Sequence, residues 1–421
     1  CHAGRSLNTC LIIAPPRERT HPGGMFNSRA DPSPSDAIRE DESLRVGDGT
    51  ASLTQGLIPG CECTLIDSYD LPMRPRVVDW TLYGLAAIAA LTGFGAWLVT
   101  DQHSRAILTA HAVAGFALLV PLAWKLRRVR LRLVRLKAWD AKTPISALTT
   151  IAVLAAIGSG AFWTHAQWPT GYPNGMHIHI VAGLALGGLL GAHVLLRFKR
   201  PARHDFSGRR DALRWLGMLG FGAALLPAKE ALNRALGLPG AQRRFTGSRH
   251  AGSDSGNAFP ITNWLFDRPT PIDTSRWRLT VRGATARVLS LSDAELARLP
   301  QTSLRATLDC TGGWYSTQTW RGISVGALLD QAGVLPSARF VSFVSVTGYR
   351  WSLPIAEARA ALLATHVGDE PLDHWHGAPL RLVAPGRRGF MWVKWVREVV
   401  VLTQPDLGQW VAIFTSGPDA T

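Results

Sequence analysis

Four long runs of apolar residues in the first half of the chain restrict what it can fold into, because none of them contains Asp, Glu, Lys or Arg. They are Tyr83–Thr100, Ala106–Trp124, Pro144–Thr164 and Ile178–Leu196. Each is close to the ~20 residues that a helix needs to cross a bilayer. Buried helices of soluble proteins rarely stay uncharged for this length four times in succession. We therefore predict a transmembrane helix bundle over residues 73–200, not a soluble helical core.

The position of the basic residues predicts how this bundle is oriented. The chain has 45 Lys and Arg against 30 Asp and Glu, and segments 125–142 and 197–214 hold 15 of the 45. Each of these segments directly follows an apolar run, so the positive-inside rule makes both cytoplasmic. The loops 101–105 and 165–177 then face outward. Because the surplus charge flanks membrane runs, nucleic acid is not an expected partner.

Residues 1–72 are expected to be disordered, because they are rich in Pro, Gly, Ser, Asp and Arg and have no apolar periodicity. Part of this segment is a candidate for non-native sequence, since Met25 or Met73 could be the true start. Four of the five cysteines lie here, which argues against a disulfide framework. Only Cys310 lies in a segment expected to fold.

A shorter apolar run, Trp215–Leu226, lies in a basic linker over residues 201–244. Its 12 residues are too few for a full span, which predicts a short fifth helix. Arg209 and Arg210 precede it and resemble a twin-arginine export signal, although a chance pair in a basic segment is the alternative. Four spans would leave the C-terminal part inside and five would place it outside. We expect the C-terminal part to lie on the outer side of a bacterial cell membrane.

The second and fourth runs repeat one pattern, which indicates a duplicated two-helix hairpin. His111–Leu118 and His179–Leu186 are 68 residues apart and share His-x-Val-Ala-Gly-x-Ala-Leu. The repeat places His111 and His179 at the same depth near the outer face, where two neutral imidazoles suit haem iron. Gly115 and Gly183, one turn deeper, would leave room for a porphyrin. Hydrogen bonding to a neighbouring helix is the alternative role for such a histidine.

A second haem would need another pair of histidines. His193 lies 14 residues after His179, but the equivalent position in the first repeat is Lys125. We therefore expect one haem, and a second only if His193 has another partner. His103, His165 and His177 are expected to face solvent. The four runs and the histidine pair resemble four-helix b-type cytochromes, which implies haem b and electron exchange with the quinone pool or another carrier.

From about residue 245 the composition changes to that of a mixed α+β domain, which we assign to residues 245–421. Short β-type runs alternate with Gly and Pro turns, and two segments have helical patterns. The expected strands are Arg278–Val281, Phe340–Val346, Leu380–Val383 and Val399–Leu402, and the expected helices are Ser324–Ala332 and Ile355–Thr365.

Cys310 stands at the centre of the chemically informative part of this domain. It lies in Leu308–Trp314, between a β-type run and a Gly-Gly turn. A thiolate there is a good ligand for a transition metal, although a lone cysteine is more often structural. Downstream, His376–Val383 and Pro385–Trp395 are dense in Arg, Lys, His and Gly. That composition suits a ligand with a phosphate and polar rings, and a solvated basic edge is the alternative.

In chain order, the motifs Cys-x-Gly-Gly-Trp, Trp-x-Gly, Ser-x-x-Gly-Tyr, His-Gly-x-Pro-Leu-Arg and Lys-Trp resemble the molybdopterin-binding domain of the sulfite oxidase family, over about residues 245–403. The resemblance implies that Cys310 is the protein ligand of molybdenum. It also implies that the molybdopterin contacts Asn257, Phe259, Ser345, His376, Arg381, Trp392, Val393 and Lys394. His376 stands where some members have Asn.

The same resemblance implies an oxygen-atom transfer enzyme, acting by sulfite oxidation or sulfoxide-type reduction. Arg350 and Arg388, with Arg387 nearby, are candidates for holding a small oxo-anion beside the metal. We therefore expect a membrane-bound molybdenum oxidoreductase that exchanges electrons with quinone through haem b. One alternative is an electron-transfer cytochrome with a non-catalytic C-terminal binding module. Another is a haem-free membrane anchor for a molybdenum enzyme.

Overall fold

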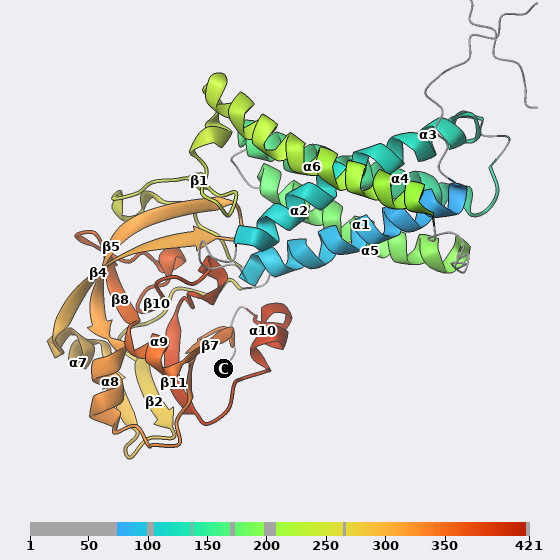
Figure 1. Ribbon diagram of the computed structural model, residues 1–421. Coiled ribbons are helices and arrows are strands. Elements are labelled where there is room, and N and C mark those ends of the chain that lie inside the picture. The colour runs from blue at the N-terminus through green and yellow to red at the C-terminus, as the bar shows by residue number, and fades with distance from the viewer. Residues whose placement is uncertain are drawn as a thin grey trace, which may run out of the picture. The chain divides into compact units, whose positions relative to one another are not determined.

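The computed structural model describes residues 74–98, 105–135, 137, 139–168, 173–197, 208–263 and 267–417. These residues form a bundle of long helices followed by an α+β domain with two β-sheets (Figure 1). The predicted fold class is therefore confirmed. The segment expected to be disordered, residues 1–72, lies outside the described part of the chain.

The four apolar runs form the long helices of the bundle. These are α1 (Pro75–Gly95), extended by η1 (Ala96–Leu98), the consecutive pair α2 (Arg105–Ala117) and α3 (Leu119–Val134), α4 (Thr143–Ala166) and α5 (Gly175–Arg197). Among the residues that the structure describes, four stretches are long and apolar enough to cross a membrane, and the α2–α3 stretch covers 30 residues. These spans indicate a membrane protein.

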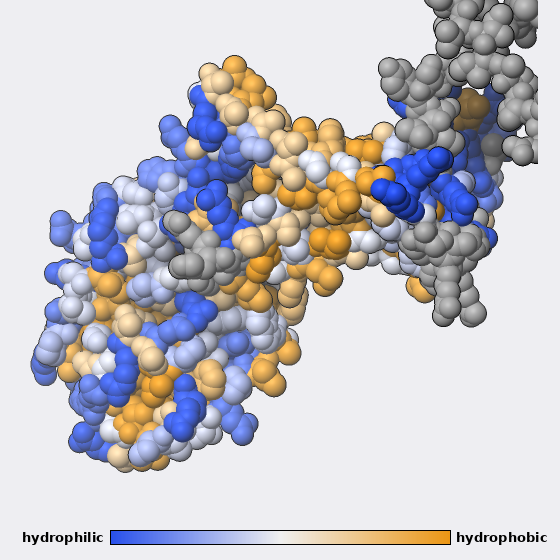
Figure 2. All heavy atoms as spheres, viewed as in Figure 1, coloured by the Kyte–Doolittle hydropathy of each residue, from blue (hydrophilic) through white to orange (hydrophobic). Residues whose placement is uncertain are grey.

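Helix α1 packs on α2 and α4 packs on α5, so the sequence repeat is a repeat of packed hairpins. Large apolar side chains point away from the bundle. Leu91, Val181 and Leu184 are each more than 60% exposed, as expected for side chains that face lipid. Hydrophobic residues cover much of the visible surface of the bundle, and a hydrophilic cluster marks one end (Figure 2).

Helix α6 (Arg209–Ala235) is longer than the short fifth helix that we predicted. It has 27 residues and continues past Pro227. Polar residues extend the helix beyond the apolar run because they have partners in the fold. Asn233 Nδ2 donates to Thr164 O at 2.9 Å, and Lys229 pairs with Glu230. The length of the apolar run therefore underestimated the length of the helix.

The C-terminal domain contains two sheets. One has the order β1-β5-β8-β10, with β4 paired to β5 and β9 paired to β8, and the other has the order β3-β2-β11-β6-β7. The strands are β1 (Arg249–His250), β2 (Arg278–Gly283), β3 (Leu289–Ser292), β4 (Gln301–Cys310), β5 (Trp314–Ser324), β6 (Phe340–Ser345), β7 (Arg350–Pro354), β8 (Leu362–Val367), β9 (Glu370–Pro371), β10 (Arg381–Val383) and β11 (Val396–Leu402). The four predicted strand segments all fall on strands.

Short helices join these strands. They are η4 (Pro239–Gln242), η5 (Gly256–Ala258), α7 (Asp293–Arg298), α8 (Val325–Ala332), α9 (Ile355–Arg359), η6 (His374–His376), η7 (Gly389–Met391) and α10 (Gln409–Thr415). Helix α8 is the predicted helix after Ser324, whose hydroxyl accepts from the Ala327 amide.

The helix predicted over Ile355–Thr365 is wrong in its second half. Helix α9 ends at Arg359, and strand β8 begins at Leu362. Strand β8 pairs with both β5 and β10, and Leu363 is fully buried. Tertiary pairing and burial therefore override the helical propensity of an Ala- and Leu-rich segment.

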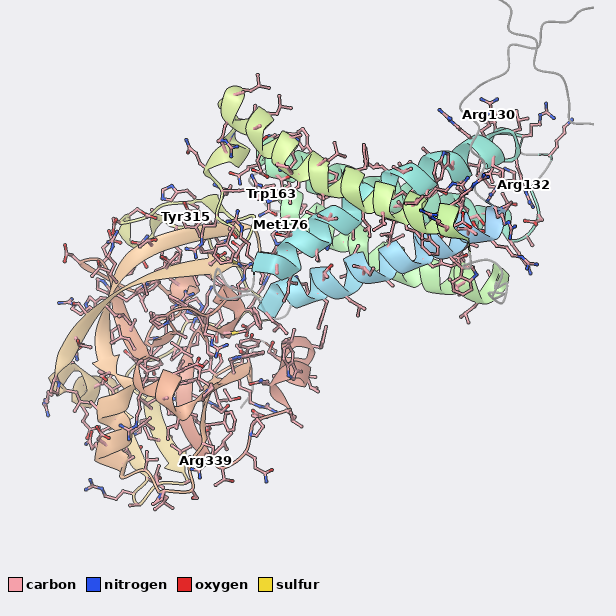
Figure 3. The ribbon with its side chains drawn as sticks, viewed as in Figure 1. Arg130, Arg132, Trp163, Met176, Tyr315 and Arg339 are labelled. Atoms are coloured by element: carbon pink, nitrogen blue, oxygen red, sulfur yellow. The ribbon has the colours of Figure 1, made fainter. Side chains whose placement is uncertain are left out.

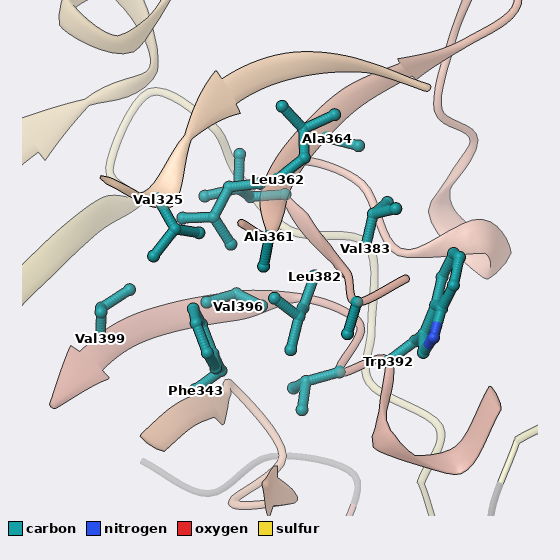
Figure 4. Packing of buried hydrophobic residues seen from close by; sticks show 14 of the residues in the cluster. Val325, Phe343, Ala361, Leu362, Ala364, Leu382, Val383, Trp392, Val396 and Val399 are labelled. Carbon is teal, nitrogen blue, oxygen red and sulfur yellow. The ribbon is translucent and has the colours of Figure 1, made fainter. Parts of the chain in front are cut away.

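The core of this domain lies between the two sheets. Figure 4 shows Val325, Phe343, Leu362, Leu382 and Val399 packed together there. The bundle has a separate core around Val77, Leu82 and Leu118, where α1 packs against α2 and α3. Each part therefore has its own hydrophobic core.

Candidate active site

Cys310 is the last residue of β4 and is buried. The β4–β5 hairpin pairs Cys310 with Trp314, so the residues from Thr311 to Gly313 form the turn after the cysteine. The Gly312 amide donates to Cys310 Sγ at 3.3 Å. Burial raises the pKa of the Cys310 thiol, while the Gly312 amide and the charge of Arg388 oppose that rise. A bound cation would favour the thiolate further.

Asp309, next to Cys310, holds one of the two arginines predicted to bind substrate. Arg388 Nη1 lies 2.7 Å from Asp309 Oδ1, and Arg388 Nη2 donates to Cys310 O at 3.4 Å. The Thr246 and Ser248 hydroxyls donate to the same carboxylate at 2.8 and 2.7 Å. The fold thus fixes a buried arginine beside the cysteine.

Arg350, the other predicted substrate arginine, lies in a different environment. Its Nε donates to Asp406 Oδ2 at 2.7 Å, and the two residues line a polar groove with Arg282 and Ser342. Arg387 is half-buried and pairs with Glu357. Of these three arginines, only Arg388 forms a hydrogen bond with Cys310 in the described part of the chain.

His376 is buried and its two ring nitrogens have partners. Nδ1 lies 2.9 Å from Asp373 Oδ1, and Nε2 lies 3.0 Å from Phe259 O. The His376 ring also packs edge-on against the Phe259 ring, with 4.0 Å between the centroids. Asn257 Oδ1 accepts from the Asp373 amide at 3.1 Å. Asn257, Phe259 and His376, all predicted cofactor contacts, are therefore brought together.

Two cations, the buried Arg381 and the partly buried Lys394, lie beside this group. Arg381 Nη1 donates to His376 O at 2.8 Å, and its guanidinium lies 5.4 Å from the ring centroid of Trp320. Lys394 Nζ donates to Trp375 O at 2.6 Å and to Asn263 Oδ1 at 2.5 Å. Neither side chain forms an ion pair with a described carboxylate.

The lowered pKa values of Arg381 and Lys394 are those expected of cations that bind an anionic group. Burial lowers the pKa of Arg381 to about 10. Burial and, after it, the charge of Arg381 lower the pKa of Lys394 to about 7. The Arg381 Nε hydrogen has no acceptor among the described residues. Buried charge without a counter-charge is costly, so the residues fit a ligand that carries a phosphate.

The remaining predicted contacts surround this cluster. Trp392 stacks edge-on against Trp320, with centroids 5.6 Å apart, and Val393 O accepts from the Leu382 amide. Ser345 is buried at the end of β6, and its hydroxyl accepts from the Thr347 amide at 3.2 Å.

Sequence reasoning missed the acidic and polar residues that hold the site together. Asp309 and Asp373 anchor Arg388 and His376, and Thr262 accepts from Trp314 Nε1 at 3.0 Å beside Cys310. One signal was available in the sequence. Asp373 stands three residues before His376, as an N-cap does, and its carboxylate accepts from the His376 amide.

The bundle also contributes residues that were expected to face solvent. His177 Cε1 would lie 3.5 Å from a Cβ at Gly312, and Asn174 Nδ2 donates to Gly312 O. His165 hydrogen-bonds Asn233. The expectation of solvent-facing loop histidines is therefore wrong for His165 and His177, and His103 lies outside the described residues.

The histidine pair of the repeat meets inside the bundle. The His111 and His179 rings lie 5.8 Å apart. Their Nδ1 atoms lie 2.8 Å from Ala89 O and 2.9 Å from Ala156 O, so each Nδ1 carries the hydrogen and each Nε2 has its lone pair available. This tautomer is the one that a metal-binding imidazole needs.

Glycines shape the space around these rings. A Cβ at Gly93 would lie 2.9 Å from His111 Cε1, and one at Gly160 would lie 2.8 Å from His179 Cε1. At Gly115 and Gly183, in contrast, a Cβ would meet nothing within 4 Å. In both halves of the repeat, one glycine (Gly93 or Gly160) packs against the imidazole, and the other (Gly115 or Gly183) has open space beside it.

His193 has a different neighbourhood from the histidine pair. Its Nδ1 lies 3.3 Å from Ser146 Oγ, and its ring lies 6.4 Å from that of Tyr83. Lys125, the residue at the equivalent position in the first repeat, pairs with Asp79 at 3.0 Å. The position that would have to supply a second ligand therefore holds a lysine with a carboxylate partner.

Comparison with known proteins matches residues 267–410 to the family described as oxidoreductase molybdopterin binding domain. The C-terminal half of the chain therefore carries a molybdopterin-binding oxidoreductase domain of the sulfite oxidase family. This match confirms the enzyme class that the motifs predicted.

Three relatives illustrate the similarity. The chain is 28% identical over 156 residues to "Uncharacterized oxidoreductase YuiH" of Bacillus subtilis, which covers 36% of this chain and 78% of the relative. It is 31% identical over 175 residues to mitochondrial sulfite oxidase of Mus musculus, and the match covers 34% of this chain and 32% of the relative. It is 27% identical over 253 residues to the protein-methionine-sulfoxide reductase catalytic subunit MsrP of Gluconobacter oxydans, and the match covers 51% of this chain and 78% of the relative. The chain thus spans about a third of the length of the sulfite oxidase.

Proposed function

We propose that this protein is a membrane-bound molybdenum oxidoreductase that transfers an oxygen atom to or from a small oxo-anion or sulfoxide-type substrate. Electrons would pass between the molybdenum site and the quinone pool, or another carrier, through haem b. The observation that carries the proposal is the buried Cys310 beside two cations, Arg381 and Lys394, that form no ion pair with any carboxylate in the described part of the chain. Relatives named sulfite oxidase and methionine-sulfoxide reductase support the two substrate classes.

The residues of the site have separate tasks in this proposal. The cofactor, when bound, supplies the metal at which an oxygen atom is exchanged as two electrons move. Cys310 would hold the metal, and Arg381 and Lys394 would hold the phosphate of the pterin. Arg388 is fixed by Asp309 beside Cys310, so its charge would attract an anionic substrate. The hydrogen bonds of Asp309 keep that guanidinium from turning away.

Haem b is supported by the histidine pair. His111 and His179 face one another with available Nε2 atoms, and Gly115 and Gly183 line open space. The pairing of Lys125 with Asp79 favours a single haem.

Helix α6 supports a fifth membrane crossing. Near its start, Trp215 Nε1 donates to Thr81 Oγ1 of α1 at 2.8 Å, and near its end Asn233 donates to Thr164 O of α4. Thr81 lies at the start of α1 and Thr164 at the end of α4. Under the positive-inside rule these are the inner and outer ends. The helix therefore runs the length of the bundle, which favours a periplasmic catalytic domain.

A labelling experiment tests on which side of the membrane the catalytic domain lies. The four cysteines of residues 1–72 are replaced by Ser, and an exposed cysteine is introduced by Ala297→Cys or, as the inner control, Ala141→Cys. A membrane-impermeant maleimide applied to intact cells should label the first variant only. Labelling of Ala141→Cys alone would contradict the fifth crossing.

Metal analysis and a reduced-minus-oxidised spectrum test the function. Detergent-purified wild type should contain molybdenum and a haem b band, and Cys310→Ser should retain the haem band while losing oxygen-atom transfer to sulfite or methionine sulfoxide. Haem without molybdenum would contradict the enzyme and favour the electron-transfer alternative. Molybdenum without haem would leave only a membrane-anchored molybdenum enzyme.

A further inference from the structure

The outer end of the α4–α5 hairpin contacts the turn that follows Cys310. Asn174 Nδ2 donates to Gly312 O at 2.5 Å, and both groups are buried. A Cβ at Gly313 would lie 2.7 Å from Cβ of Met176 and 3.0 Å from Cζ2 of Trp163. Figure 3 shows Trp163 and Met176 close to one another at the end of the bundle that is opposite Arg130 and Arg132. The membrane helices therefore touch the turn of the metal-binding cysteine.

Asn174 is held in place by the first turn of α5. Its Oδ1 accepts from the His177 amide at 3.0 Å, and its own amide donates to His177 Nδ1 at 3.3 Å. This reciprocal pair has the pattern of a capping box, with His at the third helical position. While Oδ1 of the Asn174 side chain is held by this cap, Nδ2 of the same side chain donates to Gly312 O.

His177 lies on the same side of this turn as the thiol. A Cβ at Gly312 would lie 3.4 Å from Cys310 Sγ and 3.5 Å from His177 Cε1. His179, the proposed haem ligand, is two residues further along α5. One helical turn thus carries the contact to the cysteine turn and the ligand of the haem.

We propose that Asn174 is a positioning residue that holds the Cys310 turn, and that residues 174–179 form the electron route between the two cofactors. The inference rests on the proposed function for the identity of those cofactors. Oxidation of a substrate with an oxygen atom from water releases two electrons and two protons. The electrons would leave the molybdenum site singly for the haem, where each would reduce ferric to ferrous iron, and a quinone would take up both electrons with two protons. Sulfoxide-type reduction runs the same electron route backward.

The test uses Asn174→Ser in the full-length holoprotein. Serine is as good an N-cap as asparagine, so the start of α5 is kept while the donor to Gly312 O is lost. The matched control is Asn233→Ser, which removes an outer-end asparagine bonded to Thr164 and His165. Flash photoreduction with a flavin reduces the haem, and the haem absorbance then relaxes as the electron moves to molybdenum.

We expect this relaxation to slow several-fold in Asn174→Ser, because the turn that carries Cys310 loses a buried hydrogen bond and is held less firmly. The molybdenum(V) electron paramagnetic resonance signal should change in the same variant. Asn233→Ser should keep the wild-type rate and signal. Wild-type rate and signal in Asn174→Ser would overturn the proposal. If the wild type itself shows no relaxation, the proposed function fails, and the electron route fails with it.

Alkylation of Cys310 tests the positioning role without either cofactor. In cofactor-free protein, iodoacetamide should modify Cys310 several-fold faster in Asn174→Ser than in wild type, measured by peptide mass spectrometry. Equal rates in the two proteins would show that Asn174 does not hold the turn, whatever the outcome for the haem.

Discussion

The motifs predict which charged residues form the site, but the burial and hydrogen bonding of these residues come only from the fold. Arg381 and Lys394 could be named from the order of motifs along the chain. Their low exposure and their lack of ion pairs with described carboxylates could not be predicted, because the residues that surround them come from distant segments. Trp320 and Asn263 are examples of such partners. The anchoring roles of Asp309 and Asp373 were hidden for the same reason.

Lys394 should make the stability of the cofactor-free protein depend on pH. Its pKa is lowered to about 7 in the fold, whereas an unfolded lysine titrates near ~10.4. Between these values the unfolded chain binds one more proton than the folded chain, so stability rises with pH across this window. Thermal unfolding at pH 7 and pH 9 should show that rise in wild type and a smaller rise in Lys394→Met. Equal pH dependence in both would contradict the lowered pKa.

Gly160 should be required for binding of the proposed haem. In Gly160→Ala the new Cβ would lie 2.8 Å from His179 Cε1, so the imidazole must move from its hydrogen bond to Ala156 O. We expect loss or a clear shift of the haem b band in purified protein. The control is Gly158→Ala, where a Cβ meets nothing within 4 Å. An unchanged spectrum in Gly160→Ala would count against His179 as a ligand.

Helices and strands could be predicted from the sequence where a single pattern of apolar residues extends over the whole element. The four apolar runs gave their helices because an uncharged run leaves few alternatives. Two elements differed. The apolar run of α6 was short, but Asn233 and its partners on α4 extend the helix. The segment after α9 has a helical composition, yet Leu363 becomes part of β8 because β5 and β10 lie on its two sides. Contacts far apart in sequence decided both cases.

Strand β8 should be a major contributor to the stability of the C-terminal domain. Leu363 is fully buried in the hydrophobic core of the domain, so Leu363→Ala should lower the free energy of unfolding by about 2–5 kcal/mol. Leu407→Ala, at a side chain that is 75% exposed, should change it little. Chemical denaturation followed by tryptophan fluorescence measures both. Comparable losses in the two variants would contradict the placement of β8 in the core.

At the scale of the whole molecule, the two proposed cofactors belong to parts with separate hydrophobic cores. The composition change near residue 245 predicts a domain boundary at that point. The contact between them could not be predicted, because Asn174 and Gly312 are 138 residues apart and neither lies in a motif that implies the other. The division implies that damage to the packing of the bundle should remove haem before molybdenum.

Gly222 provides a test of this division. In α6, a Cβ at Gly222 would lie 2.5 Å from Val113 O and 3.0 Å from the Ala117 amide nitrogen, so Gly222→Leu must separate α6 from α2. We expect detergent-purified Gly222→Leu to lose most of its haem b absorbance and to retain its molybdenum. In the control, Gly220→Leu, the new Cβ meets nothing within 4 Å, and both cofactors should stay. Loss of molybdenum in step with haem from Gly222→Leu would mean that the two parts fold as one cooperative unit. The bundle would then support the catalytic domain itself and would not only carry its electrons.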